Sequence, residues 1–395
     1  MSQLKNKMAL LVTLIAVVMS GSAFAVDLVV QEAGPVGTYA SINAAVAASV
    51  DGDRIIINNK PGGFPWLEDI LINKSLTFLS AVDNARFLVQ GEYTVQHAPG
   101  REVNIIGMEN IDGDIASIAN GATSRTIVNI MWCKLTSGGI YFAHHFFELN
   151  ASNNTSSGVT LVYGKVIGNS GGSIALISDA VAGIDSVHIV GNIVNGISSS
   201  SSTHYIYISN NLVNNNSSSN TNVNLLNTKS GTGVNVVRNN SIQTGDNGIG
   251  VAAICSGNII IYNNMIRDYT GIGDYGIINY STASLIVSFN FITSSWDFAS
   301  ISGFVNDGTN TFSNSLTFNG DGSSSWIGTL DGGSPGIADT DLDLTRNDPG
   351  CFGGSYSHAN FFPIDGTSSK VYYLQMPSEI LVGGSNAVTG HSFDR

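Results

Sequence analysis

The feature that most constrains the fold of this chain is a short strand-like motif that recurs about every 25 residues. Its clearest copy is IIYNNMI at residues 260–266, where two amides interrupt an apolar run. Further copies are VVRNNSI at 236–242, YISNNLV at 207–213, HIVGNIV at 188–194, IVSFNFI at 286–292 and TFSNSL at 311–316, with weaker ones at 162–167, 131–135 and 106–111. Short β-branched segments at a regular period, separated by Gly, Asn and Ser, indicate a solenoid whose coils stack on one another.

The residue pattern excludes two other classes of solenoid. The Leu-x-x-Leu-x-Leu grid of leucine-rich repeats is missing, and helical repeats need longer units with apolar residues three and four apart. We therefore predict an all-β, single-domain right-handed parallel β-helix.

The repeated amides are expected to be architectural. Asn residues at one place in every coil stack about 4.8 Å apart and hydrogen-bond along the stack, which offsets the cost of burying an amide. Asn also tolerates a left-handed backbone and can turn the chain between two sheets. The predicted ladder consists of Asn192, Asn211, Asn240, Asn264, Asn290 and Asn314, with Glu109, Cys133 and Lys165 at the same place in earlier coils.

The two ends of the chain differ from the repeats. Residues 1–25 carry two lysines, an apolar run and a close of small residues, which is the layout of a secretory signal peptide. Residues 38–48 place apolar side chains on one helical face, so we expect an N-terminal α-helical cap on a β-helix spanning 26–354. Residues 355–395 lose the repeat and contain two strand-like runs, which favour a C-terminal hairpin cap or the first strands of a truncated module.

Several segments resemble one group of known proteins. TYASINAAVAASVDGDRIIINN followed by EDILINKSLTFLSA resembles the opening of secreted right-handed β-helix proteins of the pectate lyase and pectin methylesterase superfamily. The NN strands are similar to the repeats of that group, and GSPGIADTDLDLTRNDPGCFGG at 333–354 resembles a closing segment of many secreted bacterial members. The resemblance implies the fold and a polysaccharide partner. The signal segment predicts a secreted or cell-surface location, with the periplasm as an alternative. It does not imply one activity, because the superfamily contains lyases, hydrolases, esterases, epimerases and binding proteins.

The charge balance narrows the class of partner. The chain carries 16 Lys and Arg against 29 Asp and Glu, and removal of the two lysines in 1–25 leaves 14 against 29, a net charge of −15. This field repels nucleic acid and anionic lipid, and also an anionic polysaccharide unless calcium or a local basic cluster reverses the sign. No run of eighteen apolar residues follows the signal segment, so we expect an exported monomer without a membrane span. Cys133, Cys255 and Cys351 are too few for a disulfide framework and are expected to be buried thiols.

One irregular loop carries the best candidate for chemistry. The segment MIRDYTGIGDYGI at 265–277 contains Arg267, Asp268 and Asp274, and Asp246 lies one coil earlier. A polysaccharide lyase needs a basic residue beside a cation that neutralises the substrate acid, so Arg267 is a candidate base and the three acids are candidate calcium ligands. The structural alternative is a surface ion pair between Arg267 and its acidic neighbours. Candidate sugar-stacking residues are Tyr269, Tyr275 and Tyr280.

Two further patterns fit a metal site only in part. Asp339, Asp341 and Asp343 have the alternate spacing of a calcium loop, without its glycine or its distal Glu. A calcium ion here would be structural and would hold down the C-terminal segment. His144 and His145 are adjacent and lie among phenylalanines, which favours a half-buried aromatic loop over a metal pair.

The sequence leaves three functional interpretations. The first is a protein that engages extracellular polysaccharide along a lateral groove, for which the sequence defines no active site. The second is an enzyme, most plausibly the calcium-assisted lyase; the hydrolase version is weak because TGDNGIGV at 244–251 has Asn247 in place of the second Asp of the polygalacturonase GDD element. The third is a surface adhesin or structural spacer, for which the Ser/Asn-rich runs at 198–203 and 214–222 would be solvated loops.

Overall fold

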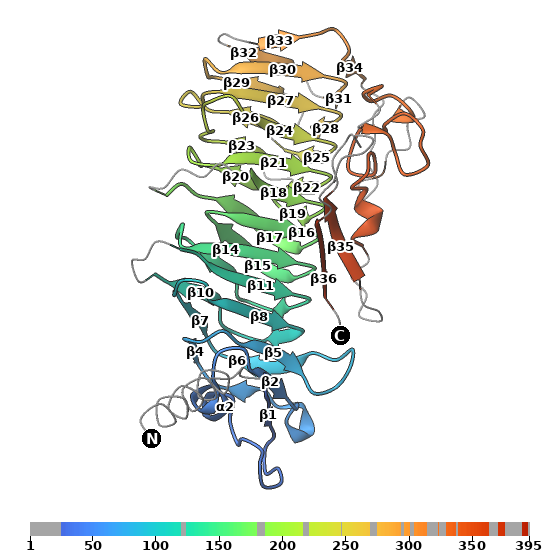
Figure 1. Ribbon diagram of the computed structural model, residues 1–395. Helices are drawn as coiled ribbons and strands as arrows, with labels where there is room; N and C mark the ends of the chain where they lie inside the picture. The colour runs from blue at the N-terminus through green and yellow to red at the C-terminus, as the bar shows by residue number, and fades with distance from the viewer. Residues whose placement is uncertain are drawn as a thin grey trace, which may run out of the picture.

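The computed structural model is a right-handed parallel β-solenoid whose coils stack along one axis (Figure 1). The structure describes residues 25–119, 124–179, 186–215, 221–245, 247–268, 275–293, 296–300, 304–313, 323, 329–336, 339–362, 370–375 and 389–393. The predicted fold class is confirmed, because nearly all regular structure in these residues is parallel β-strand.

One face of the solenoid, sheet A, contains one strand from each coil in sequence order. Its 13 strands are β1 (Asp27–Val30), β2 (Arg54–Ile57), β5 (Thr77–Ser80), β8 (Glu102–Ile106), β11 (Thr126–Met131), β14 (Phe147–Ser152), β16 (Gly164–Ile167), β18 (Ser186–Val190), β21 (Tyr205–Ser209), β24 (Val234–Arg238), β27 (Asn258–Tyr262), β30 (Ser284–Ser288) and β33 (Phe304–Asn306).

The other strands form sheet B, which has two faces. The first face contains β3 (Trp66–Leu67), β6 (Phe87–Gln90), β9 (Met108–Asn110), β12 (Lys134–Leu135), β19 (Ile193–Val194), β22 (Leu212–Asn215), β25 (Ser241–Thr244), β28 (Met265–Asp268), β31 (Phe291–Thr293) and β34 (Thr311–Phe312). The second contains β4 (Ile70–Ile72), β7 (Tyr93–Gln96), β10 (Ile115–Ile118), β13 (Ile140–Phe142), β20 (Ile197–Ser199), β23 (Val223–Leu225), β26 (Ile249–Val251), β29 (Tyr275–Asn279) and β32 (Trp296–Ser300). Two long strands, β15 (Thr155–Leu161) and β17 (Ser170–Leu176), pair with strands of both faces.

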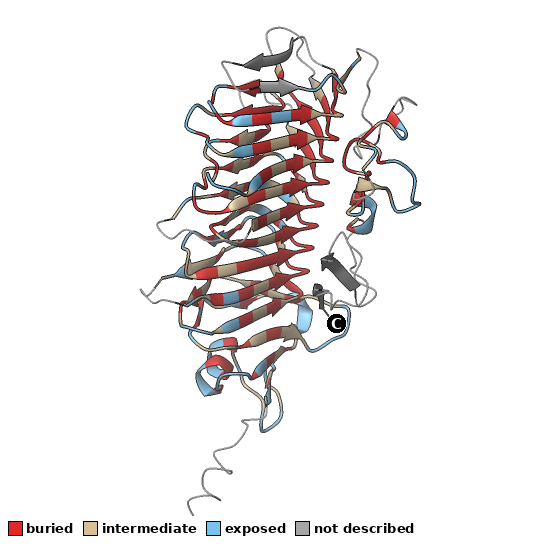
Figure 2. Ribbon diagram, turned by 45° about the horizontal axis from the view of Figure 1, so that its top comes forward, coloured by how far each residue is buried: buried red, intermediate tan, exposed pale blue. Residues whose placement is uncertain are grey.

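The core is a stack of aliphatic side chains inside the coils. Successive side chains of a strand point to opposite faces, so alternate residues enter the interior (Figure 2). In sheet A one such position is at most 1% exposed in every coil from β2 to β30, and its residues are Ile55, Phe78, Ile105, Ile130, Ala151, Val166, Ile189, Ile208, Val237, Ile261 and Val287. All three cysteines are buried, as expected.

The two amides of each NN pair have separate roles at the corner between sheet A and the first face of sheet B. The first amide residue has a left-handed backbone, with φ of 56° at Asn210, 50° at Asn239 and 56° at Asn263. Gly168 and Gly191 take the same place in earlier coils, with φ of 64° and 67°. Asn and Gly adopt this conformation at the least cost, so they allow the chain to turn there.

The second amide of each pair forms the buried ladder. Asn264 donates from Nδ2 to Oδ1 of Asn290 at 2.9 Å, and its own Oδ1 accepts from Nδ2 of Asn240 at 2.9 Å. The same bond joins all successive rungs, which are Asn154, Asn169, Asn192, Asn211, Asn240, Asn264, Asn290 and Asn310. The predicted ladder is confirmed for its described members, and the rung after Asn290 is Asn310; Asn314 lies outside the described residues.

The register predicted for two earlier coils is wrong. Lys165 lies in β16 on the outer face of sheet A, and the rung of that coil is Asn169. Glu109 is displaced from the rung position by one residue, since it lies in register with Lys134, the residue after Cys133. Cys133 is placed correctly, because its N–H donates to Oδ1 of Asn154. A coil of only 15 residues separates Asn154 from Asn169, and so short a coil is missed when a period near 25 is assumed.

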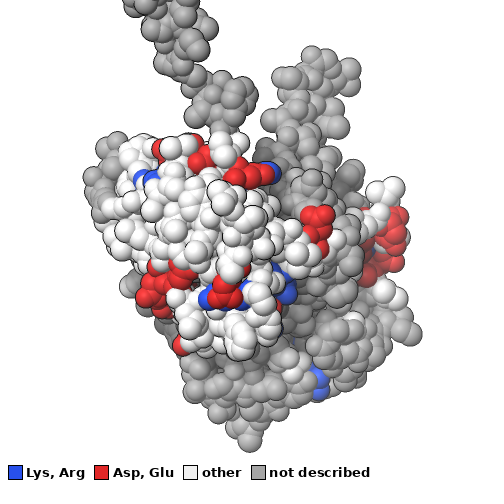
Figure 3. Space-filling model, turned by 90° about the horizontal axis from the view of Figure 1, so that it is seen from below, with Lys and Arg blue, Asp and Glu red and all other residues white. Residues whose placement is uncertain are grey.

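The predicted N-terminal helix is α2 (Ile42–Ala48), which contacts β1, β2 and β4. The carboxylate of Glu68 accepts the N–H groups of Ile42 and Asn43 at its start. At its end, the ammonium of Lys74 donates to the carbonyls of Val46, Ala47 and Ser49. Residues of the first coils thus satisfy orphan backbone groups at both helix termini. Seen from this end of the molecule, Asp and Glu form several separate groups, and Lys and Arg are fewer (Figure 3).

The C-terminal part of the chain turns back along the solenoid. Residues 329–336 and 339–362, which we call the strap, lie along the corner formed by the left-handed residues (Figure 1). The two strand-like runs predicted after residue 355 form an antiparallel hairpin, β35 (Lys370–Gln375) and β36 (Thr389–Phe393). Figure 1 shows this hairpin at the height of the middle coils and far from β33.

Candidate functional site

The residues predicted for a lyase are only partly described. Arg267 is half-buried on the outer face of β28, in register with Gln243 and Thr293. Asp268 ends the same strand. The two other predicted calcium ligands, Asp246 and Asp274, lie outside the described residues, so the convergence of acids on Arg267 stays a prediction.

Two of the three predicted sugar-stacking tyrosines, Tyr275 and Tyr280, lie at opposite ends of β29. Tyr275 begins β29, and its N–H donates to Oδ1 of Asn247 at 3.0 Å. Tyr280 follows the same strand and is 51% exposed. Tyr269 lies outside the described residues. Their role as a stacking surface stays a prediction.

The three acids of the predicted calcium loop lie in the strap, and each accepts hydrogen bonds from different residues. Asp339 accepts from Arg238 and Tyr262 of the solenoid. Asp341 accepts the N–H groups of two later strap residues, and burial raises the pKa of its carboxyl. Asp343 is exposed and accepts from the N–H and hydroxyl of its neighbour Thr345, which lower its pKa. Within the described ranges, no group of three or more His, Cys, Asp and Glu residues is arranged to hold a metal ion.

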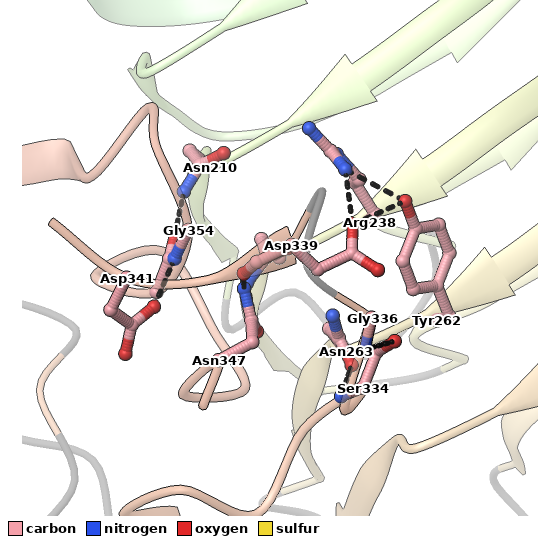
Figure 4. A network of polar contacts seen from close by, with 12 residues as sticks. Asn210, Arg238, Tyr262, Asn263, Ser334, Gly336, Asp339, Asp341, Asn347 and Gly354 are labelled. Carbon is pink, nitrogen blue, oxygen red and sulfur yellow. Dashed lines mark hydrogen bonds and ion pairs between the residues drawn. The ribbon is translucent and has the colours of Figure 1, made fainter. Parts of the chain in front are cut away.

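The strap is held by the side chains of the corner asparagines. Asn210 donates to the carbonyls of Cys351 and Gly353, and Oδ1 of Asn263 accepts the N–H of Ser334 at 2.7 Å (Figure 4). Asn239 donates to Oδ1 of Asn347 at 2.9 Å and to the carbonyl of Asp348 at 3.0 Å. The outward amide of the NN pair therefore serves both as a turn residue and as a docking group.

One charged cluster joins the strap to sheet A. Nη1 of Arg238, in β24, lies 2.7 Å from Oδ1 of Asp339 and donates to the hydroxyl of Tyr262, in β27, at 2.8 Å (Figure 4). The hydroxyl of Tyr262 donates to the same Asp339 oxygen at 3.2 Å. The side chains of Arg238 and Asp339 are each only 14% exposed. This is a carboxylate held between a guanidinium and a phenol at the edge of sheet A.

Aromatic side chains continue from this cluster along the outer face of sheet A. The ring of Tyr207 lies 5.1 Å from the Arg238 guanidinium and 5.3 Å from the ring of His188. Tyr356 and Phe362 of the strap pack in the same cluster as Tyr207. Burial raises the pKa of Tyr207 to about 12 and lowers the pKa of His188 to about 4. The strap therefore covers the part of this face that carries Tyr, His and Arg.

Sheet A carries a second amide row on its outer face, in earlier coils. Asn104 donates to the Thr77 hydroxyl at 3.2 Å, Asn129 to Oδ1 of Asn104 at 2.7 Å and Asn150 to Oδ1 of Asn129 at 3.0 Å. The next residue in register is Lys165. The contacts of the strap lie at the coils from Gly168 to Phe289, whereas this outer amide row (Asn104, Asn129 and Asn150) precedes them.

A cluster that the sequence pattern did not reveal lies at the opposite edge of sheet A. Nδ1 of His145 is 2.8 Å from Oδ2 of Asp179, and the Arg125 guanidinium lies 3.8 Å from the ring of Tyr163. Nε of Arg125 donates to the carbonyl of His145 at 3.2 Å. His145 also contacts Phe146 at 4.0 Å between ring centroids, so the predicted half-buried aromatic loop is confirmed. The residues of this cluster come from separate loops, so the His144–His145 pair was its only signal in the sequence.

Comparison of the chain with protein-family models, with curated proteins and with solved structures found no match. In the part of the chain that the structure describes, no helix combines the length and the apolar character needed to cross a membrane. The site is therefore interpreted from its own geometry.

Proposed function

We propose that this protein is exported through the signal segment at residues 1–25 and binds an extracellular polysaccharide along the outer face of sheet A. The observation that carries the proposal is the outer amide row, which repeats one hydrogen-bonding group at the strand spacing of about 4.8 Å. A polysaccharide also repeats its hydroxyl groups, so such a row can hold several sugars at once. The resemblance to secreted β-helix proteins of the pectate lyase-like superfamily agrees with an extracellular glycan as ligand.

The proposal favours a neutral polysaccharide for the amide row. Amides donate and accept hydrogen bonds without charge, which suits sugar hydroxyls. The net charge of −13 repels a polyanion from most of the surface. Calorimetric titration of the full chain with a panel of neutral and acidic polysaccharides tests this selectivity.

The proposed site at the outer amide row is tested by the same Asn→Ala substitution on sheet A and on sheet B. Asn129→Ala removes a central member of the amide row, and Asn224→Ala makes the same change on the outer face of β23 in sheet B. Loss of one or two hydrogen bonds to sugar should weaken binding about three- to tenfold for Asn129→Ala and leave the Asn224→Ala affinity unchanged. Equal affinities for the two variants would place the glycan elsewhere.

A second candidate, acid–base chemistry on the same polymer, is favoured by the His145–Asp179 pair. Oδ2 of Asp179 lies 2.8 Å from Nδ1 of His145 and accepts the backbone N–H of the same residue, which holds the imidazole in place, and Arg125 adds a positive charge nearby. His145→Ala should then abolish cleavage of a bound polysaccharide without changing its affinity. Absence of new reducing ends or unsaturated products from the unmodified protein would leave binding as the function.

A further inference from the structure

We propose that Arg238, Tyr207 and Tyr262 form a binding site for an external carboxylate group, and that Asp339 of the strap is its present, exchangeable occupant. The site is separate from the outer amide row and goes beyond polysaccharide binding there. A ligand that supplies the carboxylate would displace Asp339, and with it the strap from the aromatic part of sheet A.

The first argument is that the site is built into rigid strands. Arg238 and Tyr262 are directly in register on the neighbouring strands β24 and β27, and Tyr207 comes from β21 on the other side of Arg238. The guanidinium lies 5.1 Å from the Tyr207 ring and 5.8 Å from the Tyr262 ring. Rings on both sides restrict the guanidinium, so its donors are oriented before any carboxylate arrives.

The second argument is that this position requires an anion. Arg is always protonated in proteins, and a largely buried charge is costly unless an opposite charge pairs with it. The Tyr262 hydroxyl donates to the same oxygen as Arg238, so both groups favour an acceptor that carries negative charge. Asp339 supplies that charge from a segment 101 residues further along the chain.

The third argument is that Asp339 fits the site incompletely. A single oxygen of Asp339 takes both hydrogen bonds, although a carboxylate and a guanidinium can pair through two. Nε of Arg238 is buried and makes no hydrogen bond with the described residues. A carboxylate that is free of the strap can pair with the edge of the guanidinium that carries Nε and Nη2, which Asp339 does not use.

An external carboxylate must compete with the Asp339 carboxylate, which is tethered to the site by the chain. An intramolecular group acts at an effective concentration of about millimolar or more, so small carboxylates at lower concentration should not displace Asp339 from the unmodified chain. Removal of the Asp339 carboxylate removes the competitor and leaves Arg238 without a partner. The emptied site should then take up a small carboxylate from solution.

The test is rescue of a variant by acetate. In the full chain, Asp339→Ala should lower the thermal unfolding midpoint, and acetate should raise it again at constant ionic strength, whereas acetamide of the same shape should not. Acetate at ten times its dissociation constant should shift the unfolding equilibrium by about tenfold. Asp343→Ala removes an exposed strap carboxylate that, among the described residues, bonds to Thr345 alone, so the midpoint of this variant should respond to neither compound.

Three results would overturn the proposal. They are an Asp339→Ala midpoint that acetate leaves unchanged, an equal response to acetamide, and an equal response of Asp343→Ala. If Asp339→Ala does not fold, Asp339→Asn keeps the shape and one acceptor oxygen, and saturable acetate-dependent shifts of the Arg238 side-chain resonances then decide. Hydrogen exchange at residues 347–354 gives an independent readout, because exchange in the unmodified chain should rise in concentrated acetate and not in acetamide.

Discussion

Replacement of Asn240 by Ala measures what the buried ladder contributes to stability. The Asn240 side chain accepts two hydrogen bonds from Asn211, through the backbone N–H and Nδ2, and donates to the carbonyl of Ile208 and to Oδ1 of Asn264. It is fully buried, so water does not replace these partners. The substitution leaves two buried backbone groups, the Asn211 N–H and the Ile208 carbonyl, without the hydrogen bond that Asn240 provides.

The expected loss follows from these two groups. A buried donor or acceptor left unsatisfied costs about 1 to 3 kcal/mol, so Asn240→Ala should destabilise the chain by about 2 to 6 kcal/mol. Asn129→Ala is the matched control, since it removes an amide from a half-buried ladder on the outer face of the same sheet. Water can solvate Oδ1 of the half-buried Asn104, and only Nδ2 of Asn150, which is 7% exposed, loses a buried partner, so the control should lose about half as much as Asn240→Ala.

Urea unfolding followed by circular dichroism provides the assay. Both variants should keep the slope of the unmodified chain, and Asn240→Ala should shift the midpoint about twice as far as Asn129→Ala. A loss from Asn240→Ala no larger than that from Asn129→Ala would show that the inner ladder is not a main source of stability. The assignment of the repeated Asn to architecture would then lose its energetic basis.

Three other outcomes follow from the structure. The folded pKa of His188 is about 4, because burial and then Lys165 lower it from 6.5. Between pH 6.5 and pH 4 the unfolded chain therefore binds a proton at His188 that the folded chain does not bind. The free energy of unfolding should be constant above pH 6.5 and fall by about 3 kcal/mol as the pH drops to 4. A His188→Gln variant should show a flatter pH profile, and an NMR titration midpoint of His188 near 6.5 in the folded chain would contradict this reasoning. Gly191→Ala places a methyl group 2.2 Å from Phe361, so hydrogen exchange in strap residues 351–361 should increase. Gly37→Ala, which is also at a positive φ but has no neighbour within 4 Å, should leave the strap unchanged. Lys74→Met removes the ammonium that binds three carbonyls at the end of α2, so hydrogen exchange should show this helix destabilised by about 1 to 2 kcal/mol. Lys60→Met is the control, because the ammonium of Lys60 lies over Trp66 and its loss should leave the helix unchanged.

The fold was predictable because its signal is local and repeated. Each NN strand contains its own alternation of apolar residues and its own turn residue, so IIYNNMI alone indicates a strand, a corner and a rung. The prediction of the ladder from Asn192 to Asn290 required only a constant place in each coil. It failed at Lys165, because the coil between Asn154 and Asn169 has only 15 residues and breaks the assumed period.

The candidate sites were less predictable, because their residues meet only through the winding of the chain. Arg238 and Asp339 are 101 residues apart, and His145 and Asp179 are 34 apart on separate loops. Neither pair has a motif, since no fixed spacing along the chain is needed for two side chains that different coils bring together. The outer amide row is similar, because Asn104, Asn129 and Asn150 are unremarkable until register aligns them.

The sequence by itself determined the parallel β-solenoid, its corner and its inner ladder, because periodic burial and backbone conformation are properties of each coil. The first Asn of IIYNNMI was also predictable as a turn residue from its tolerance of a left-handed backbone. Only the tertiary structure decided that this same Asn263 binds the strap and that the aromatic part of sheet A is covered. Both features depend on where the non-repeating strap lies along the solenoid. Contacts between a repeated coil and a distant irregular segment produce no periodic pattern in the sequence, so they cannot be predicted from it.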